Sequence, residues 1–195
     1  QAYYGIAIQI SSITLLATTA LIKVFWKEIS EAFQNSDFEK ISYLYNKVSR
    51  LLFFIGSLIA SFFIPWTPQI IDVLLGPQYL SGINVLYIMF LYPIHQSIGQ
   101  ITNTMFYATS KTKILTYINS AFLIIGLLVA YYLIAPQNNY LPGLDLKSEG
   151  LALKMIIMQI IFVNISSWIL SREFNWEYEW KFQIQIFLIL FPVGF

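Results

Sequence analysis

The sequence lacks cysteine, has one histidine and is poor in charge. Without cysteine, this stretch has no disulfides, no thiol nucleophile and no cysteine metal ligands. Charged residues make up only 11% of the 195 residues, whereas an ordinary soluble domain carries about 25%. A soluble domain of this length would still need a charged surface. We therefore infer that lipid is the solvent for most of its surface.

The missing charges leave long apolar runs. Residues 1–22 carry no charge, and neither do residues 73–110 if His95 is neutral. A helix crosses the hydrocarbon core with about 20 apolar residues, whereas open strands would leave backbone groups unpaired in lipid. Runs such as Leu51-Leu52-Phe53-Phe54-Ile55 do not alternate in polarity as barrel strands do. The sequence therefore predicts an all-α integral membrane protein.

We predict a polytopic transmembrane helix bundle that forms a single domain over residues 1–195. The chain begins with Gln1 and ends with Phe195, each inside an apolar run, so we expect a fragment of a larger protein whose last segment is truncated. The predicted spans are residues 2–22, 51–74, 83–108, 114–134, 150–170 and 182–195.

The basic residues predict which way the bundle faces. The connections 23–50, 109–113 and 171–181 hold nine of the 11 lysines and arginines. The opposite connections, 75–82 and 135–149, hold only Lys147. Basic residues mark the cytoplasmic side of a membrane protein, so we expect the first three connections to be cytoplasmic.

The 23–50 connection is the one long cytoplasmic loop, and we predict that part of it is an amphipathic helix. Ser36-Asp37-Phe38-Glu39 has the S-x-x-E form of a capping box, which marks a helix start. Apolar residues then recur at helical spacing up to Val48. This helix leads into the second span.

Polar residues gather in the third predicted span. His95, Gly99 and Asn103 follow one another at four-residue spacing, and Gln96 and Gln100 lie beside them behind Pro93. Lipid cannot satisfy such side chains, so they face neighbouring helices or a wet cavity. Two interpretations stay open: hydrogen bonds between helices, or the lining of a polar substrate path.

Lys154 is the most interior charge, near the outer start of the fifth span. It either reaches back to the interface and pairs with Glu149 or Asp145, or faces an aqueous cavity and meets an anionic substrate. The tryptophans and tyrosine between residues 168 and 180 are typical of an aromatic belt at the membrane interface.

No catalytic constellation occurs in the sequence. It has no phosphate-binding G-x-x-x-x-G-K-[ST] loop, and its single histidine has no cysteine partner for a metal. We predict no catalytic, cofactor-binding or metal-binding residues, and a function other than an enzyme's. The net charge of +1 argues against a nucleic-acid partner.

The order of short motifs resembles that of the polysaccharide transporter, or O-antigen flippase (Wzx-like), family. This family belongs to the multidrug/oligosaccharidyl-lipid/polysaccharide exporter superfamily, and the resemblance is best over residues 1–120. The motifs are YYGIA at residues 3–7, FWKEIS at 25–30, IDVLLGPQY at 71–79 and YATSKTK at 107–113.

The resemblance implies the C-terminal half of a flippase with 12–14 helices and alternating access in the bacterial cytoplasmic (inner) membrane. Its cargo would be undecaprenyl-pyrophosphate-linked oligosaccharide, flipped to the periplasmic face for surface polysaccharide synthesis. The expected partners are the bilayer, this lipid-linked oligosaccharide and other polysaccharide-assembly membrane proteins. Lys154 is the one cation inside a span that would meet the pyrophosphate.

Four alternatives stay open, one of them a purely structural membrane scaffold. A lipid II flippase is the closest. A cation-coupled multidrug exporter would be expected to carry acidic residues inside its spans, where this chain has only Asp72. A membrane-embedded polysaccharide polymerase or ligase would need a large external loop bearing arginine, and the 135–149 connection has none.

Overall fold

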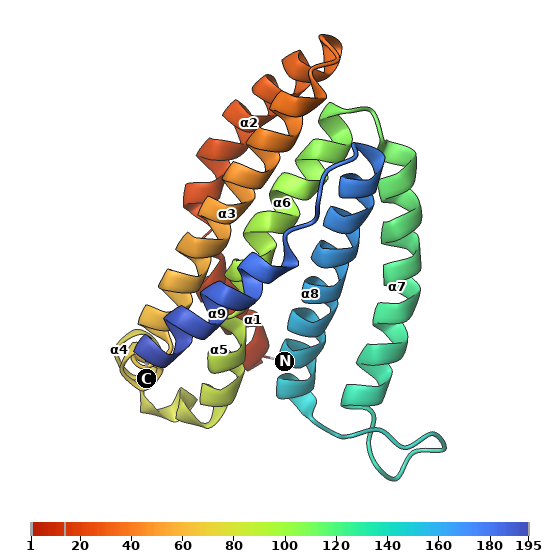
Figure 1. Ribbon diagram of the computed structural model, residues 1–195. Helices are drawn as coiled ribbons and strands as arrows, with labels where there is room; N and C mark the ends of the chain where they lie inside the picture. Colours follow the sequence, from red (N-terminus) through yellow and green to blue (C-terminus); the bar gives the residue numbers. More distant parts are fainter. Residues whose placement is uncertain (1, 14, 195) are drawn as a thin grey trace.

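The computed structural model describes residues 2–13 and 15–194, and these are helical throughout apart from short connections (Figure 1). No strand occurs among the described residues, which confirms the all-α prediction. The elements are α1 (Ala2–Ile13), α2 (Leu16–Gln34), α3 (Phe38–Phe63), α4 (Thr67–Leu74), the 3-10 helix η1 (Pro77–Gly82), α5 (Ile83–Met89), α6 (Tyr92–Ala108), α7 (Thr112–Ile134), α8 (Lys147–Glu173) and α9 (Trp180–Gly194).

Three of the described helices are long and apolar enough to cross a membrane, namely α3, α7 and α8. Much of their apolar surface faces outward: on α7, Leu127 and Leu128 are exposed by 65% and 68%. An apolar helix surface that is exposed in this way is costly in water and favourable in lipid. The chain therefore has the character of an all-α membrane protein.

Residues 23–50, predicted to be a loop with one amphipathic helix, belong almost wholly to two long helices. α2 continues to Gln34, and α3 begins after a turn at residues 35–37. Asp37 caps α3 by accepting a 2.9 Å hydrogen bond from the backbone N–H of Lys40. The predicted capping residue, Ser36, instead has a positive φ of 56° and lies within the turn, so the capping-box assignment was wrong by one position.

Proline divides two of the predicted spans. The 51–74 segment breaks between α3 and α4, and the 83–108 segment breaks at residues 90–91 between α5 and α6. Pro68 and Pro93 lie in the first turns of α4 and α6, where the missing N–H costs no helical hydrogen bond. Pro93 thus starts a helix and does not kink a continuous one.

α6 is the central helix, with α2, α3 and α8 packed around it (Figure 1). Its approach to α3 depends on Gly56, where a Cβ would lie 3.0 Å from the Ile94 Cα. Two apolar cores fill the space around α6. One includes Phe53 and Ile94, and the other, nearer the α2–α3 turn, includes Ile29 and Phe106.

The connections separate to the two ends of the bundle. The turns at 35–37 and 109–111 and the start of the 174–179 connection share one end, which we call the basic end (Figure 1). The 135–146 connection and η1 lie at the other end. The 174–179 connection then leads into α9, which packs along α3.

Candidate functional site

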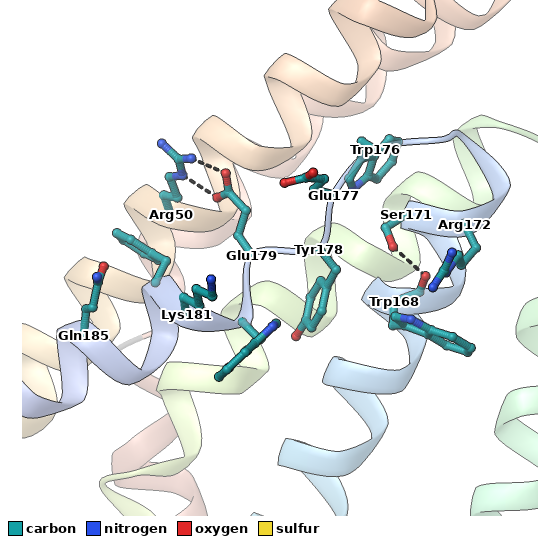
Figure 2. Close-up of a pocket in the computed structure, with 12 residues that line it drawn as sticks. Arg50, Trp168, Ser171, Arg172, Trp176, Glu177, Tyr178, Glu179, Lys181 and Gln185 are labelled. Carbon is teal, nitrogen blue, oxygen red and sulfur yellow. Dashed lines mark hydrogen bonds and ion pairs between the residues drawn. The ribbon is translucent and has the colours of Figure 1, made fainter.

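A wide cavity of about 750 Å³ opens beside the basic end, between α3, the end of α8 and the start of α9 (Figure 2). We call it the linker pocket because the 174–179 connection forms much of its wall. It is lined by Arg50 of α3, Trp168, Ser171 and Arg172 of α8, Trp176, Glu177, Tyr178 and Glu179 of the connection, and Trp180, Lys181, Phe182 and Gln185 of α9.

Two ion pairs fix the connection that forms this wall. Arg50 binds Glu179 through two nitrogens, and its guanidinium also lies 5.8 Å from the centre of the Phe182 ring. At the other end of the connection, Lys111 binds Glu173. A planar guanidinium that grips both carboxylate oxygens fixes direction as well as distance. The connection is therefore tied to α3 at one end and to the α6–α7 turn at the other.

The remaining pocket charges have no such partners. Among the described residues, no carboxylate lies within 4.0 Å of the cationic groups of Arg172 or Lys181, and no cation lies that close to Glu177. Arg172 instead lies over the Trp168 ring, 5.6 Å from its centre. With Arg50 and Glu179 neutralising each other, the pocket keeps a net charge of +1.

Tyr178 joins the pocket to the interior of the bundle. Its hydroxyl donates to the Asn164 side-chain oxygen on α8 and accepts a 2.9 Å hydrogen bond from the Gln183 amide on α9. Burial raises the pKa of Tyr178 to about 12, so its phenol stays protonated and remains a donor at neutral pH.

A buried group of hydroxyls lies one layer deeper. The Tyr45 hydroxyl is 2.8 Å from the Thr102 hydroxyl and 2.8 Å from that of Ser167, so α3, α6 and α8 are bonded together at one point. A cavity of about 30 Å³ adjoins this group, and Arg50 and Tyr178 line both this cavity and the linker pocket. That volume is enough for about one water molecule. Polar groups therefore continue from the pocket into the helix bundle.

The predicted polar stripe of α6 is divided between two neighbours. His95 is 5% exposed and makes an edge contact of 5.5 Å with the Phe53 ring of α3. Gly99 faces α8, since a Cβ there would lie 2.9 Å from the Gln159 amide nitrogen and 4.0 Å from the Gln96 oxygen. His95 and Gly99 therefore contact two different neighbouring helices, α3 and α8.

Gln100 and Asn103 each bury a side-chain oxygen that has no hydrogen-bond partner among the described residues. An acceptor buried without a partner is costly. These two residues are thus the stripe members with unused hydrogen-bonding capacity.

Lys154 lies on a different interface from the stripe. Its Nζ would be 3.7 Å from a Cβ at Gly126, so it packs against α7 where that helix has no side chain. Of its two expected partners, Glu149 accepts a 3.0 Å hydrogen bond from Asn84, and no described carboxylate lies within 4.0 Å of the Lys154 ammonium. Lys154 therefore stands apart from His95 and its neighbours.

Sequence reasoning did not anticipate the linker pocket. It assigned the aromatic residues to an interfacial belt and the basic ones to the orientation signal. The usable signal was that aromatic and charged residues are interleaved within residues 168–181: tryptophans and a tyrosine lie among Arg172 and Lys181, and Glu177 and Glu179 flank Tyr178.

No group of three or more metal-ligating side chains lies together in the part of the chain that the structure describes. No protein-family model, curated protein or solved structure matches the chain. The fold and composition define the class, an all-α membrane protein with a polar, aromatic pocket beside its basic end.

Proposed function

We propose that this chain forms part of a flippase that moves undecaprenyl-pyrophosphate-linked oligosaccharide from the cytoplasmic to the periplasmic face of a bacterial inner membrane. In this proposal the basic end is cytoplasmic, in keeping with the lysines and arginines of its connections. The linker pocket then opens where such a substrate is made and where it must enter.

One observation carries the proposal: the linker pocket leads to polar groups inside an apolar helix bundle. Arg50 and Tyr178 line both cavities, and the inner one reaches the Tyr45 hydroxyl group. A headgroup of sugars and phosphates crosses hydrocarbon only if hydrogen-bonding groups replace its water. Neutral hydroxyls and amides replace that water without trapping the headgroup by charge.

The breaks beside the short helices α4 and α5 are consistent with hinges in the proposed transport cycle. Alternating access requires some helices to move against others about hinges. The breaks at residues 64–66 and 90–91 divide two apolar segments beside the long helices α3 and α6. Such breaks let α4 and α5 tilt without unfolding the helices that carry the pocket.

The test is transport by the full-length protein in proteoliposomes. A fluorescent lipid-linked oligosaccharide is placed in both leaflets, and a membrane-impermeant reductant reports how much of it reaches the outer one. The proposal predicts exchange between leaflets that protein-free vesicles do not show. Exchange of lipid II but not of the oligosaccharide would favour the rival flippase. No exchange of either would contradict the proposal.

A strain that lacks the gene provides the cellular counterpart. It should accumulate lipid-linked oligosaccharide on the cytoplasmic face and lose surface glycan. Normal surface glycan in that strain, with no second transporter expressed, would count against the proposal.

A further inference from the structure

The linker pocket combines three kinds of group that one ligand class requires together. It has two cations without a carboxylate partner among the described residues, Arg172 and Lys181. It has aromatic rings at its walls, of which Trp168 and Trp180 are 47% and 54% exposed. It also has neutral hydrogen-bonding groups, such as the Gln185 amide.

We propose that the linker pocket binds a phosphorylated sugar headgroup, with Arg172 and Lys181 on the phosphate and the exposed indoles against the sugar. This inference rests on the proposed function, because it names where that substrate first docks. Its chemistry would equally fit the headgroup of a lipid-linked glycan and a soluble sugar phosphate.

Arg172 and Lys181 bring positive charge to two walls of the pocket. Arg172 extends from the last turn of α8 and Lys181 from the first turn of α9, and Figure 2 shows them on opposite sides of Tyr178. Guanidinium and ammonium groups are the usual phosphate-binding groups of proteins. A phosphate bound at either wall of the pocket would therefore meet a positive charge.

The aromatic rings select sugar over a plain phospholipid. A sugar ring presents C–H groups on one face and hydroxyls at its edge, and an indole offers a flat apolar face with a polar N–H. The Arg172 guanidinium lies over one face of the Trp168 ring, and Trp168 is still 47% exposed, so a phosphate-binding group and an exposed indole are adjacent. A simple anionic phospholipid headgroup would contact the cations but would have no sugar ring to stack on the indoles.

The size of the cavity agrees with a headgroup larger than phosphate. Its volume of about 750 Å³ lies within the range of roughly 300–1,000 Å³ that is common for small-molecule sites. The pocket is also open to the outside, which suits a ligand that stays attached to a lipid chain in the bilayer.

Binding is measured with the full-length protein in nanodiscs of neutral lipid, by microscale thermophoresis. The probes are a short-chain polyprenyl pyrophosphate bearing a disaccharide, the same pyrophosphate without sugar, a soluble sugar nucleotide, and dispersed phosphatidylglycerol. We expect the disaccharide probe to bind at least about tenfold more tightly than the sugarless one and than phosphatidylglycerol. The soluble sugar nucleotide separates the two sources: equal binding by it and by the disaccharide probe would assign the site to soluble sugar phosphates.

Variants then test the two halves of the pocket. The double variant R172Q/K181Q should lower affinity for the disaccharide probe and the sugarless pyrophosphate about tenfold or more, and R172K should retain most of it. Trp168→Leu should weaken only the probes that carry sugar. Lys113→Gln removes an exposed cation at the same end of the bundle but outside the pocket, and should change nothing.

Two results would overturn the inference. One is equal binding of phosphatidylglycerol and the disaccharide probe, with no effect of Trp168→Leu, which would make the pocket a site for anionic lipid only. The other is that R172Q/K181Q binds the disaccharide probe with the same affinity as the wild type, while R172K also binds it with that affinity. Failure of the proposed function would look different, since the wild type would then bind the probe without transporting it.

Discussion

Arg50 of α3 and Glu179 before α9 lie 129 positions apart in the sequence and form a two-pronged ion pair. The pair stands between the linker pocket and the small inner cavity, because both residues line both. It is therefore a contact that must change if a substrate passes from one to the other.

Breaking this pair should open the inner cavity more than it destabilises the fold. Both side chains are partly exposed, so Glu179→Gln should lower the free energy of unfolding by only about 0.2–1 kcal/mol. A cysteine at position 49, which lines the inner cavity, should nevertheless react faster with a water-soluble maleimide in this variant.

The control is the charge reversal R50E/E179R, which rebuilds the pair and should return labelling toward the wild-type rate. Equal labelling of the single variant and the wild type would show that the pair does not limit access.

Tyr45→Phe should loosen the buried hydroxyl group. The substitution removes one oxygen that bonds both Thr102 and Ser167, and these two are then left 3.3 Å from each other. Hydrogen bonds between membrane helices contribute roughly 0.6–1.7 kcal/mol, so we expect a loss of about 1 kcal/mol in a bicelle unfolding titration. Tyr43→Phe is the matched control, because Tyr43 is 60% exposed. Equal unfolding of the two variants would contradict the assignment.

Gly56→Ala should destabilise the contact between α3 and α6. Its methyl group would meet the Ile94 backbone at 3.0 Å, and backbone cannot rotate away as a side chain can. Overpacking of this kind costs roughly 1–3 kcal/mol. At Gly5 a Cβ would meet nothing within 4 Å, so Gly5→Ala should be neutral or slightly stabilising. A lower melting temperature for Gly5→Ala than for Gly56→Ala would contradict this packing.

Lys154 should respond to the size of residue 126. Gly126→Leu fills the space against which the Lys154 side chain packs, so the lysine must turn elsewhere. We expect Gly126→Leu to lower stability, and Lys154→Ala in the same background to recover part of the loss, a coupling of about 0.5–2 kcal/mol in a double-mutant cycle. Additive effects of the two substitutions on stability would show that Lys154 does not interact with residue 126.

The class of fold was readable from the sequence because the hydrophobic signal is spread over many residues. Low charge and unbroken apolar runs around Leu123–Leu128 leave helices as the structures that satisfy their own backbone in lipid. Helix boundaries were less readable, because Pro65 and Pro93 break apolar segments at points that hydropathy does not mark. Ser36 and Asp37 show the same limit: both residue types cap helices, and only the backbone conformation distinguishes them.

The pocket was not readable from the sequence because it depends on one long-range contact. Arg50 and Glu179 look like ordinary interfacial charges until α9 packs along α3 and brings them together. The neighbours of the α6 stripe were not readable for the same reason. Spacing places His95 and Gly99 four residues apart on one face of the helix, but the helices that they contact, α3 and α8, are set by packing alone.

Site-directed labelling tests the central claim, that the helices cross the bilayer with the basic end in the cytoplasm. The full-length protein in a background without other cysteines carries Ser36→Cys or Asn139→Cys, one in the α2–α3 turn and one in the 135–146 connection. A membrane-impermeant maleimide added to intact cells should label position 139 and not position 36, and inside-out vesicles should give the reverse. Labelling of both positions from the same side would contradict the account.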